Sequence, residues 1–199
     1  MKNSGVVAIY QKDRFDEYSN FARIGDGSLG GKGRGLAFMG AMVKRYPKLE
    51  TENFNTNIPK TVVICTDIFD EFMETNELLP VALSDADDET ILKYFLRASL
   101  PASLIDDLMA FFDVVKSPIA VRSSSLLEDS HYQPFAGIYS TYMIPRLEDK
   151  YEMLRLLSDA IKAVYASVFY RDSKGYMTAT SNLIDQEKMA IVLQEVVGN

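Results

Sequence analysis

Two cations that stand beside small residues are the side chains best suited to chemistry. Lys32 lies in a glycine-rich segment, residues 25–35, that runs directly into a predicted helix. Glycine lets backbone amides approach an anion without interference from a Cβ, and the first turn of a helix adds unpaired N–H groups and the positive end of the helix dipole. The segment therefore predicts a site for a phosphate chain.

Arg122 is the second cation, at the end of a predicted strand and followed by Ser123 and Ser124. A guanidinium can hold phosphate oxygens bidentately, and neighbouring hydroxyls can donate to the same group. An arginine at a strand end is more often part of a surface ion pair, and Glu128 and Asp129 are close enough in sequence to be its partners. The residues alone leave both interpretations open.

Other interpretations of segment 25–35 come from two familiar glycine motifs. The spacing Gly-x-Gly-x-x-Gly over residues 25–30 matches the dinucleotide fingerprint, but residues 15–24 look too polar for the strand that must precede it. A P-loop fails because Asp26 and Gly33 stand where it requires a glycine and a hydroxyl residue. A flexible glycine hinge with an incidental lysine is the purely structural alternative.

Two further segments carry weaker signals. Gly137 near the start of a predicted strand marks a close backbone approach, and Thr141, four residues later, points to the same face. In the last predicted strand, the backbone around Gln194 and Glu195 offers hydrogen bonds to a flat base. By composition alone, all four are ordinary sheet residues.

Several kinds of site are disfavoured by the residues present. Cys65 is the single cysteine and lies in an apolar run, which favours a buried side chain over a nucleophile and excludes an internal disulfide. His131 is the single histidine, so one Cys and one His cannot build a zinc site, and a histidine in a polar loop is usually solvated. The acidic run 85–89 is interpreted as a helix N-terminus, where negative charge is favourable, and not as a cation site.

Composition and charge narrow the class of protein further. The chain has 199 residues, of which 47% are hydrophobic and 25% charged, as in ordinary globular proteins. Its net charge of -7 disfavours nucleic acid and membrane surfaces as partners, although a nucleotide can still bind where cations are concentrated. No apolar run reaches the length of a signal peptide core or a membrane span, so we expect a cytoplasmic protein.

The elements that must position these residues alternate along the chain and indicate an α+β fold. A helix with an N-cap at Thr66 is expected to bury Ile68, Phe69, Phe72 and Met73. The remaining predicted helices are 31–46, 87–98, 101–115 and 149–170, and the predicted strands are 58–65, 118–123, 136–144 and 188–197.

The chain ends unusually, with an apolar strand followed by Gly198 and Asn199. We interpret this ending as a truncation, and we expect that the last strand forms an exposed edge that could pair with a neighbouring molecule. Within the chain, residues 1–116 and 117–199 are possible subdomains.

Taken in order, these segments resemble the nucleotide-binding domain of pyruvate phosphate dikinase, phosphoenolpyruvate synthase and their relatives. The resemblance runs from about Arg23 to the end of the chain. The segments that carry it are Gly30-Gly31-Lys32-Gly33, Ile58-Pro59-Lys60-Thr61-Val62-Val63, Val121-Arg122-Ser123-Ser124, Glu128-Asp129, Phe135-Ala136-Gly137, Tyr170-Arg171 and Ala190 to Val197.

The resemblance implies an ATP-grasp-like fold, of which this chain is the first part, with mixed sheets and flanking helices. It assigns ATP contacts as follows: Lys32 and Arg122 hold the phosphates, Gly137 and Thr141 line the phosphate side, and Gln194, Glu195 and Val197 form a hinge strand against adenine. The magnesium ligands of the family lie in a second subdomain beyond Asn199, so the resemblance assigns no metal ligand or catalytic residue here.

In the complete enzymes of this family, ATP phosphorylates a histidine on a separate domain, which passes the group to pyruvate or another acceptor. The resemblance therefore implies ATP and Mg²⁺ as cofactors, and phosphohistidine and acceptor domains downstream in the same polypeptide. The chain alone is expected to be inactive. A non-catalytic nucleotide-sensing or scaffold module is the alternative, but the presence of both Lys32 and Arg122 favours the enzyme.

Overall fold

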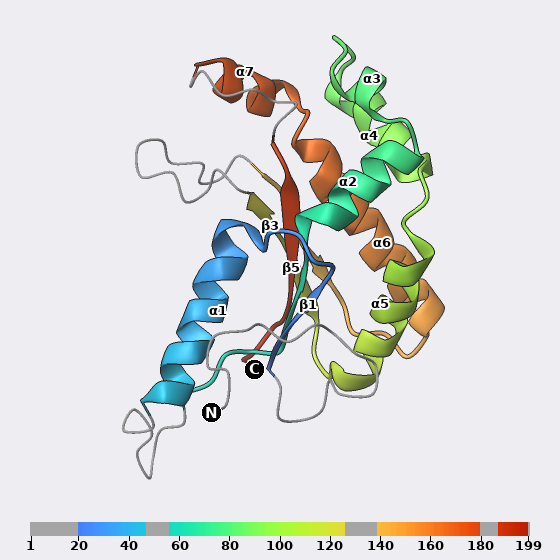
Figure 1. The fold of residues 1–199 in the computed structure, drawn as a ribbon. Helices are drawn as coiled ribbons and strands as arrows, with labels where there is room; N and C mark the ends of the chain where they lie inside the picture. Colours follow the sequence, from blue (N-terminus) through green and yellow to red (C-terminus); the bar gives the residue numbers. More distant parts are fainter. Residues whose placement is uncertain (1–19, 47–55, 126–138, 180–186, 199) are drawn as a thin grey trace.

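In the computed structural model, the described residues are 20–46, 56–125, 139–179 and 187–198. Five strands form one sheet in the order β1-β2-β5-β3-β4 (Figure 1). The strands are β1 (Phe21–Ile24), β2 (Thr61–Ile64), β3 (Ile119–Ser125), β4 (Thr141–Ile144) and β5 (Met189–Glu195).

The sheet is mixed, as the family resemblance implies. Strands β1 and β2 are parallel, and the β2–β5, β5–β3 and β3–β4 pairs are antiparallel. The sheet takes β1 and β2 from residues 1–116 and the other three strands from residues 117–199.

The helices lie on both faces of this sheet, but unequally. Helix α1 lies on one face, and helices α2, α5 and α6 lie on the other (Figure 1). The helices are α1 (Gly30–Arg45), α2 (Thr66–Thr75), α3 (Leu79–Ala82), α4 (Asp88–Arg97), α5 (Ala102–Val114), α6 (Lys150–Ser167) and α7 (Arg171–Ala179). None of them is long and apolar enough to span a bilayer.

The main core fills the side of the sheet that faces α2, α5 and α6. Alternate strand residues, such as Val62 and Val121, point into it. The buried rings of Phe72 and Tyr165 lie 5.4 Å apart, and those of Phe69 and Tyr165 lie 5.0 Å apart. The predicted apolar stripe of α2 is confirmed, since Ile68, Phe69, Phe72 and Met73 are all buried.

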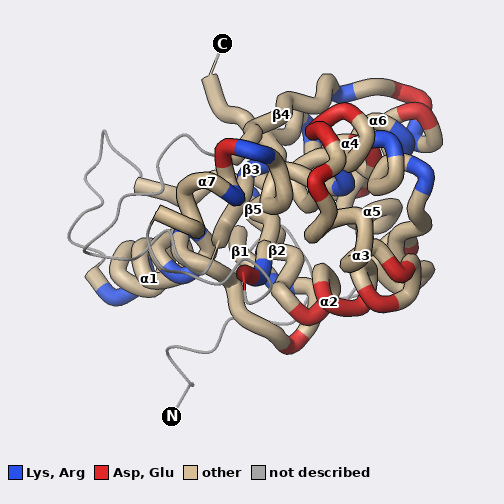
Figure 2. The backbone as a smooth tube through the Cα atoms, turned by 90° about the horizontal axis from the view of Figure 1, so that it is seen from above, with Lys and Arg blue, Asp and Glu red and all other residues tan. Residues whose placement is uncertain are grey.

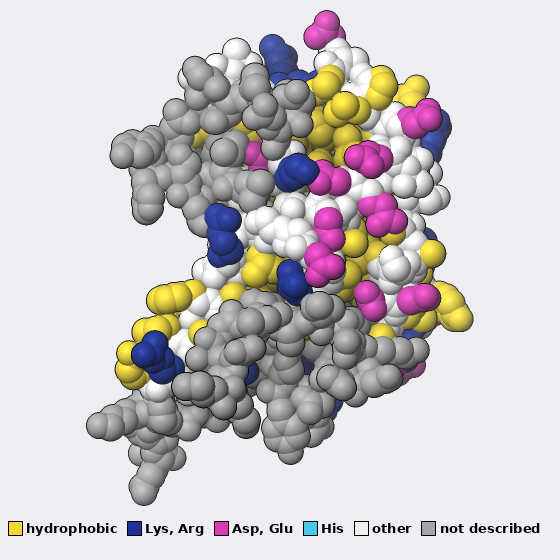
Figure 3. All heavy atoms as spheres, viewed as in Figure 1, with side chains coloured by type: hydrophobic (Ala, Val, Ile, Leu, Met, Phe, Trp, Pro, Cys, Tyr) yellow, Lys and Arg dark blue, Asp and Glu magenta, His cyan; other side chains and the backbone are white. Residues whose placement is uncertain are grey.

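A smaller cluster on the opposite face holds α1 against the sheet. Val63 and Val192 pack there with Leu29 and Leu36. Helix α1 is only partly buried, and its Met39 is 56% exposed. Exposed hydrophobic side chains along α1 are visible in Figure 3. Helix α1 therefore buries only one side of itself against this face of the sheet.

The structure corrects the sequence analysis just before the glycine-rich segment and at the start of α2. A strand does precede it, because β1 pairs with β2 despite the charged Arg23 in its middle. Thr66 is the first residue of α2 and not its N-cap; Cys65 is the N-cap and makes no side-chain capping bond. The Thr66 hydroxyl accepts a hydrogen bond from the Ser28 amide instead.

The last strand also differs from expectation, because β5 lies at the centre of the sheet between β2 and β3. Its backbone is paired on both sides, so it offers no edge to a neighbouring molecule. The short helices α3 and α7 were not predicted, and α6 ends at Ser167 rather than at residue 170.

Candidate functional site

The part of the sheet face beside α1 that this helix does not cover, called the open face below, carries polar side chains from four neighbouring strands. Thr141 is exposed, Arg122 and Gln194 are half-buried, and Thr61 is fully buried. Arg122 on β3 lies opposite Thr141 on β4. Gln194 on β5 lies opposite Thr61 on β2. All four share the face of Val63 and Val192, because strand side chains alternate and Arg122 is the cross-strand partner of Val192.

Hydrogen bonds join three of these side chains across the sheet. Nη1 of Arg122 donates to Oε1 of Gln194 at 3.3 Å, and Nε2 of Gln194 donates to the Thr61 hydroxyl at 3.1 Å. The Thr61 hydroxyl donates in turn to the Pro59 carbonyl at 2.8 Å. A neutral amide therefore orients the Arg122 guanidinium, which keeps its full positive charge for an anion.

Lys32 approaches the same strand from α1. It occupies the third position of the helix, and its Nζ lies 3.5 Å from the hydroxyl of Ser123, the residue after Arg122. Lys32 therefore meets β3 one residue beyond Arg122, although the two cations are 90 positions apart in the chain. The side chains of Arg122 and Ser123 alternate between the two faces of the sheet, so the contact places Lys32 at the end of β3 and not directly over the face of Arg122.

The amides of the glycine-rich segment are used differently from the prediction. The amide of Asp26 donates to Asp67 at 2.8 Å, and the amide of Ser28 donates to Thr66 at 2.9 Å. The amide of Gly33 donates to the hydroxyl of Ser124 at 3.0 Å. The prediction that this backbone is open to an anion is wrong at these three positions, because the protein satisfies the amides itself.

Close packing explains two of the glycines. Gly30 has φ +65°, and a Cβ on it would lie 1.8 Å from the Ser124 carbonyl oxygen. Gly25 has φ +92°, and a Cβ there would lie 2.5 Å from an Asp67 carboxylate oxygen. These glycines let the segment lie against β3 and the start of α2, so the hinge alternative does not describe them.

The remaining predicted residues are distributed as follows. Gly137 lies outside the described residues. Val197 lies two residues beyond β5 and is 69% exposed. Glu195 alternates with Gln194, and its Oε1 accepts hydrogen bonds from the amides of Lys116 and Ser117 at 2.8 and 3.0 Å. The Glu195 carboxylate therefore holds the turn between α5 and β3. The Glu195 amide is also used, because it donates to the Lys60 carbonyl at 2.8 Å.

We expect Glu195→Ala to lower the free energy of unfolding by about 1 kcal/mol, since two amides lose their acceptor. Glu195→Gln retains an Oε1 acceptor and should lose less than half as much. Urea unfolding of both variants measures the difference. Equal losses would show that the charge, and not the acceptor, stabilises the turn.

Cys65 is fully buried, as predicted for a structural cysteine. Burial, together with the neighbouring Asp67 carboxylate, raises the pKa of its thiol to about 11. At pH 8 only about one thiol in a thousand is then ionised, and the thiolate is the reactive form.

Cys65 should therefore react with a thiol reagent such as DTNB at least about a hundred times more slowly in native protein than in urea-unfolded protein at pH 8. Absorbance at saturating reagent measures both rates. A fast native reaction would contradict the burial of this side chain.

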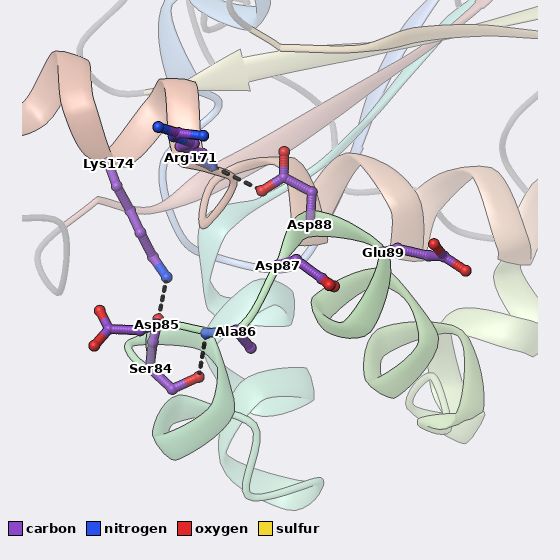
Figure 4. Close-up of a pocket in the computed structure, with 8 residues that line it drawn as sticks. All are labelled: Ser84, Asp85, Ala86, Asp87, Asp88, Glu89, Arg171 and Lys174. Carbon is purple, nitrogen blue, oxygen red and sulfur yellow. Dashed lines mark hydrogen bonds between the residues drawn. The ribbon is translucent and has the colours of Figure 1, made fainter.

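A charged cleft lies elsewhere, between α7 and the start of α4 (Figure 4). Lys174 donates to the Ser84 carbonyl at 2.7 Å, and the Arg171 amide donates to Asp88 at 2.8 Å. Asp87 caps α4, and its hydrogen bonds with Thr90 lower the pKa of the carboxyl. These contacts confirm that the acidic run 85–89 belongs to a helix N-terminus, and they attach α7 to α4.

Charge is unevenly distributed between the two sides of the sheet. Helix α1 contains Lys32, Arg34, Lys44 and Arg45 and no acidic residue, whereas α2 contains only acidic charges. Figure 2 shows acidic residues along α2 and at the start of α4. An acidic protein thus presents cations on the side where the polar sheet face is open, which favours an anionic ligand there.

Three residues with a place near this site were not predicted from the sequence. Thr61 completes the hydrogen-bonded row, and its spacing from Val63 would have placed it on the correct face. Thr66 and Asp67 bind the glycine-rich segment, but a local sequence pattern cannot predict contacts between residues about 40 positions apart. Among the residues described, no group of three or more His, Cys, Asp or Glu side chains could hold a metal ion.

Comparison with known proteins identifies the family of this chain. Residues 26–199 match the family model described as pyruvate phosphate dikinase, AMP/ATP-binding domain. The chain is also 27% identical over 145 residues to the uncharacterized phosphotransferase YvkC of Bacillus subtilis (strain 168). That alignment covers 71% of this chain and 16% of YvkC, so the chain spans about one sixth of the relative's length.

The family match includes Lys32, Arg122, Thr141 and Gln194, the residues of the open face and its neighbouring helix. This chain belongs to the AMP/ATP-binding domain family of pyruvate phosphate dikinase.

Proposed function

We propose that the open sheet face beside α1 binds ATP and that the chain is the ATP-binding part of a phosphotransferase of the dikinase type. In this proposal ATP supplies a phosphoryl group to a histidine on another domain, and the histidine delivers it to pyruvate or a related acceptor. The proposal includes Mg²⁺ with the nucleotide, held by residues outside those described here.

The observation that carries the proposal is the approach of Lys32 Nζ to Ser123, the residue that follows Arg122 on β3. A triphosphate carries several negative charges, and two cations from separate elements can neutralise them in a fixed geometry. Thr141, opposite Arg122, adds a hydroxyl at the same height of the sheet. Phosphoryl transfer depends mainly on this kind of positioning and charge neutralisation.

The adenine is proposed to lie farther along β5, against Gln194 and the backbone from Glu195 to Val197. Gln194 already connects Arg122 to Thr61, so one side chain joins the proposed phosphate and base regions. Gly137 is proposed to line the phosphate side as well.

A non-catalytic nucleotide-sensing module is the second candidate. The observation that favours it is that amides of the glycine-rich segment donate hydrogen bonds to other groups of the protein. A segment whose amides are already used offers fewer donors to a phosphate during transfer. ATP binding without phosphoryl transfer would support this candidate.

Calorimetric titration with ATP and Mg²⁺ tests binding, and incubation of the natural full-length protein with γ-labelled and β-labelled ATP tests transfer. The dikinase proposal expects binding and acid-labile label on a histidine. Binding with no label on protein or acceptor would favour the sensing module, and no binding would overturn both candidates.

A further inference from the structure

The start of α2 holds the glycine-rich segment on the side away from β3. Ser28 forms a reciprocal pair of bonds with Thr66: the Ser28 amide donates to the Thr66 hydroxyl at 2.9 Å, and the Thr66 amide donates to the Ser28 carbonyl at 3.0 Å. Asp67 adds a third bond by accepting from the Asp26 amide at 2.8 Å. Thr66 is 5% exposed, so water cannot easily replace its hydroxyl.

The Asp67 carboxylate packs against the backbone of the glycine-rich segment. One carboxylate oxygen takes the Asp26 amide, and the other is buried with no hydrogen-bond partner among the described residues. A Cβ on Gly25 or on Gly27 would lie within 2.8 Å of that second oxygen. An unpaired buried carboxylate oxygen is unfavourable, so the surrounding structure must fix it in place.

The held segment leads directly to Lys32. The Ser28 hydroxyl accepts from the Gly30 amide at 3.2 Å, and Gly30 begins α1. Lys32 follows two residues later and extends toward Ser123. The position of Ser28 therefore sets the position of the first turn of α1, from which Lys32 reaches β3.

We propose that Thr66 and Asp67 are positioning residues for nucleotide binding: they fix the glycine-rich segment so that Lys32 meets the phosphates beside Arg122. The inference rests on the proposed function, since it gives these residues their effect through the Lys32–phosphate contact. It extends the site to the start of α2, which touches neither phosphate nor base in the proposed arrangement.

Thr66→Val and Thr66→Ser form a matched pair for the test in the natural full-length protein. Valine has nearly the same shape as threonine and lacks the hydroxyl, whereas serine keeps it. We expect Thr66→Val to weaken ATP binding at least about fivefold and AMP binding less than about twofold, because AMP lacks the phosphates that Lys32 would hold. Thr66→Ser should bind both nucleotides as the wild type does.

A double-mutant cycle with Lys32→Ala separates positioning from general damage to the fold. If Thr66 acts through Lys32, then Thr66→Val should add less than about twofold to the loss already caused by Lys32→Ala. Hydrogen exchange should show faster exchange of the Ser28 amide in Thr66→Val than in Thr66→Ser. Asp67→Ala serves as the second variant should Thr66→Val fail to fold, with faster exchange expected at Asp26.

Wild-type ATP affinity in Thr66→Val, equal losses for ATP and AMP, or multiplicative losses with Lys32→Ala would each overturn the inference and leave the proposed function standing. Absence of ATP binding by the wild-type protein would overturn the proposed function instead. Hydrogen exchange would then still report whether Thr66 holds the segment.

Discussion

Arg122→Ala is expected to weaken ATP binding by more than about tenfold, which corresponds to about 1.4 kcal/mol. The guanidinium lies on the open sheet face, and its hydrogen-bond partner among the described residues is an amide rather than a carboxylate. Binding a phosphate therefore requires no ion pair with a described carboxylate to be broken. Calorimetric titration of the wild type and the variant with ATP and Mg²⁺ measures the change.

Two further substitutions define what Arg122 contributes. Arg122→Lys keeps the charge and loses the planar fork, so an intermediate affinity is expected if the phosphate contact is bidentate. Arg155→Ala is the matched control, because Arg155 lies on α6 and pairs with Glu152 on the surface. Arg155→Ala should leave ATP affinity unchanged; a loss equal to that of Arg122→Ala would mean that net charge, and not the site, governs binding.

Lys32→Ala is expected to have an effect of similar size, since its Nζ approaches the residue after Arg122. If neither alanine variant changes ATP affinity, the open face is not the phosphate site. The sensing and dikinase proposals would then both need another location for the nucleotide.

The elements that sequence analysis predicted well are those that bury an apolar stripe. Helix α2 shows this, because Phe69 and Phe72 recur at helical spacing and both are buried. Strand β1 was missed since it has only four residues, one of them Arg23, and its pairing with β2 cannot be seen in a local window. The central place of β5 is likewise a property of pairing, which the order of segments along the chain does not reveal.

For the candidate site as well, local features could be predicted from the sequence, and contacts between distant segments could not. Residue type identified Lys32 and Arg122 as cations beside small residues. The family resemblance put Thr141 on the phosphate side, and in the structure Thr141 lies opposite Arg122. The partners of the glycine-rich segment were beyond prediction, because Asp67 and Ser124 are far from it in sequence. Glycine shows that something approaches closely, but only the fold shows that the approaching atom at Gly30 is the Ser124 carbonyl oxygen.

Gly30→Ala is expected to lower the free energy of unfolding by more than about 2 kcal/mol. A left-handed backbone alone costs a non-glycine residue about 1–2 kcal/mol. The new Cβ would also overlap a backbone oxygen of β3, which cannot move aside as a flexible side chain can. The start of α1 must therefore shift away from β3, and Lys32 with it.

Gly35→Ala is the matched control within the same helix. A Cβ at Gly35 meets no atom within 4 Å, and alanine is a better helix former than glycine by about 1 kcal/mol. Urea unfolding should therefore show Gly30→Ala destabilised and Gly35→Ala as stable as the wild type or more so. If both variants unfold like the wild type, α1 does not pack against β3 as described; if Gly30→Ala loses ATP affinity as well as stability, the contact between α1 and β3 also sets the separation of the two cations.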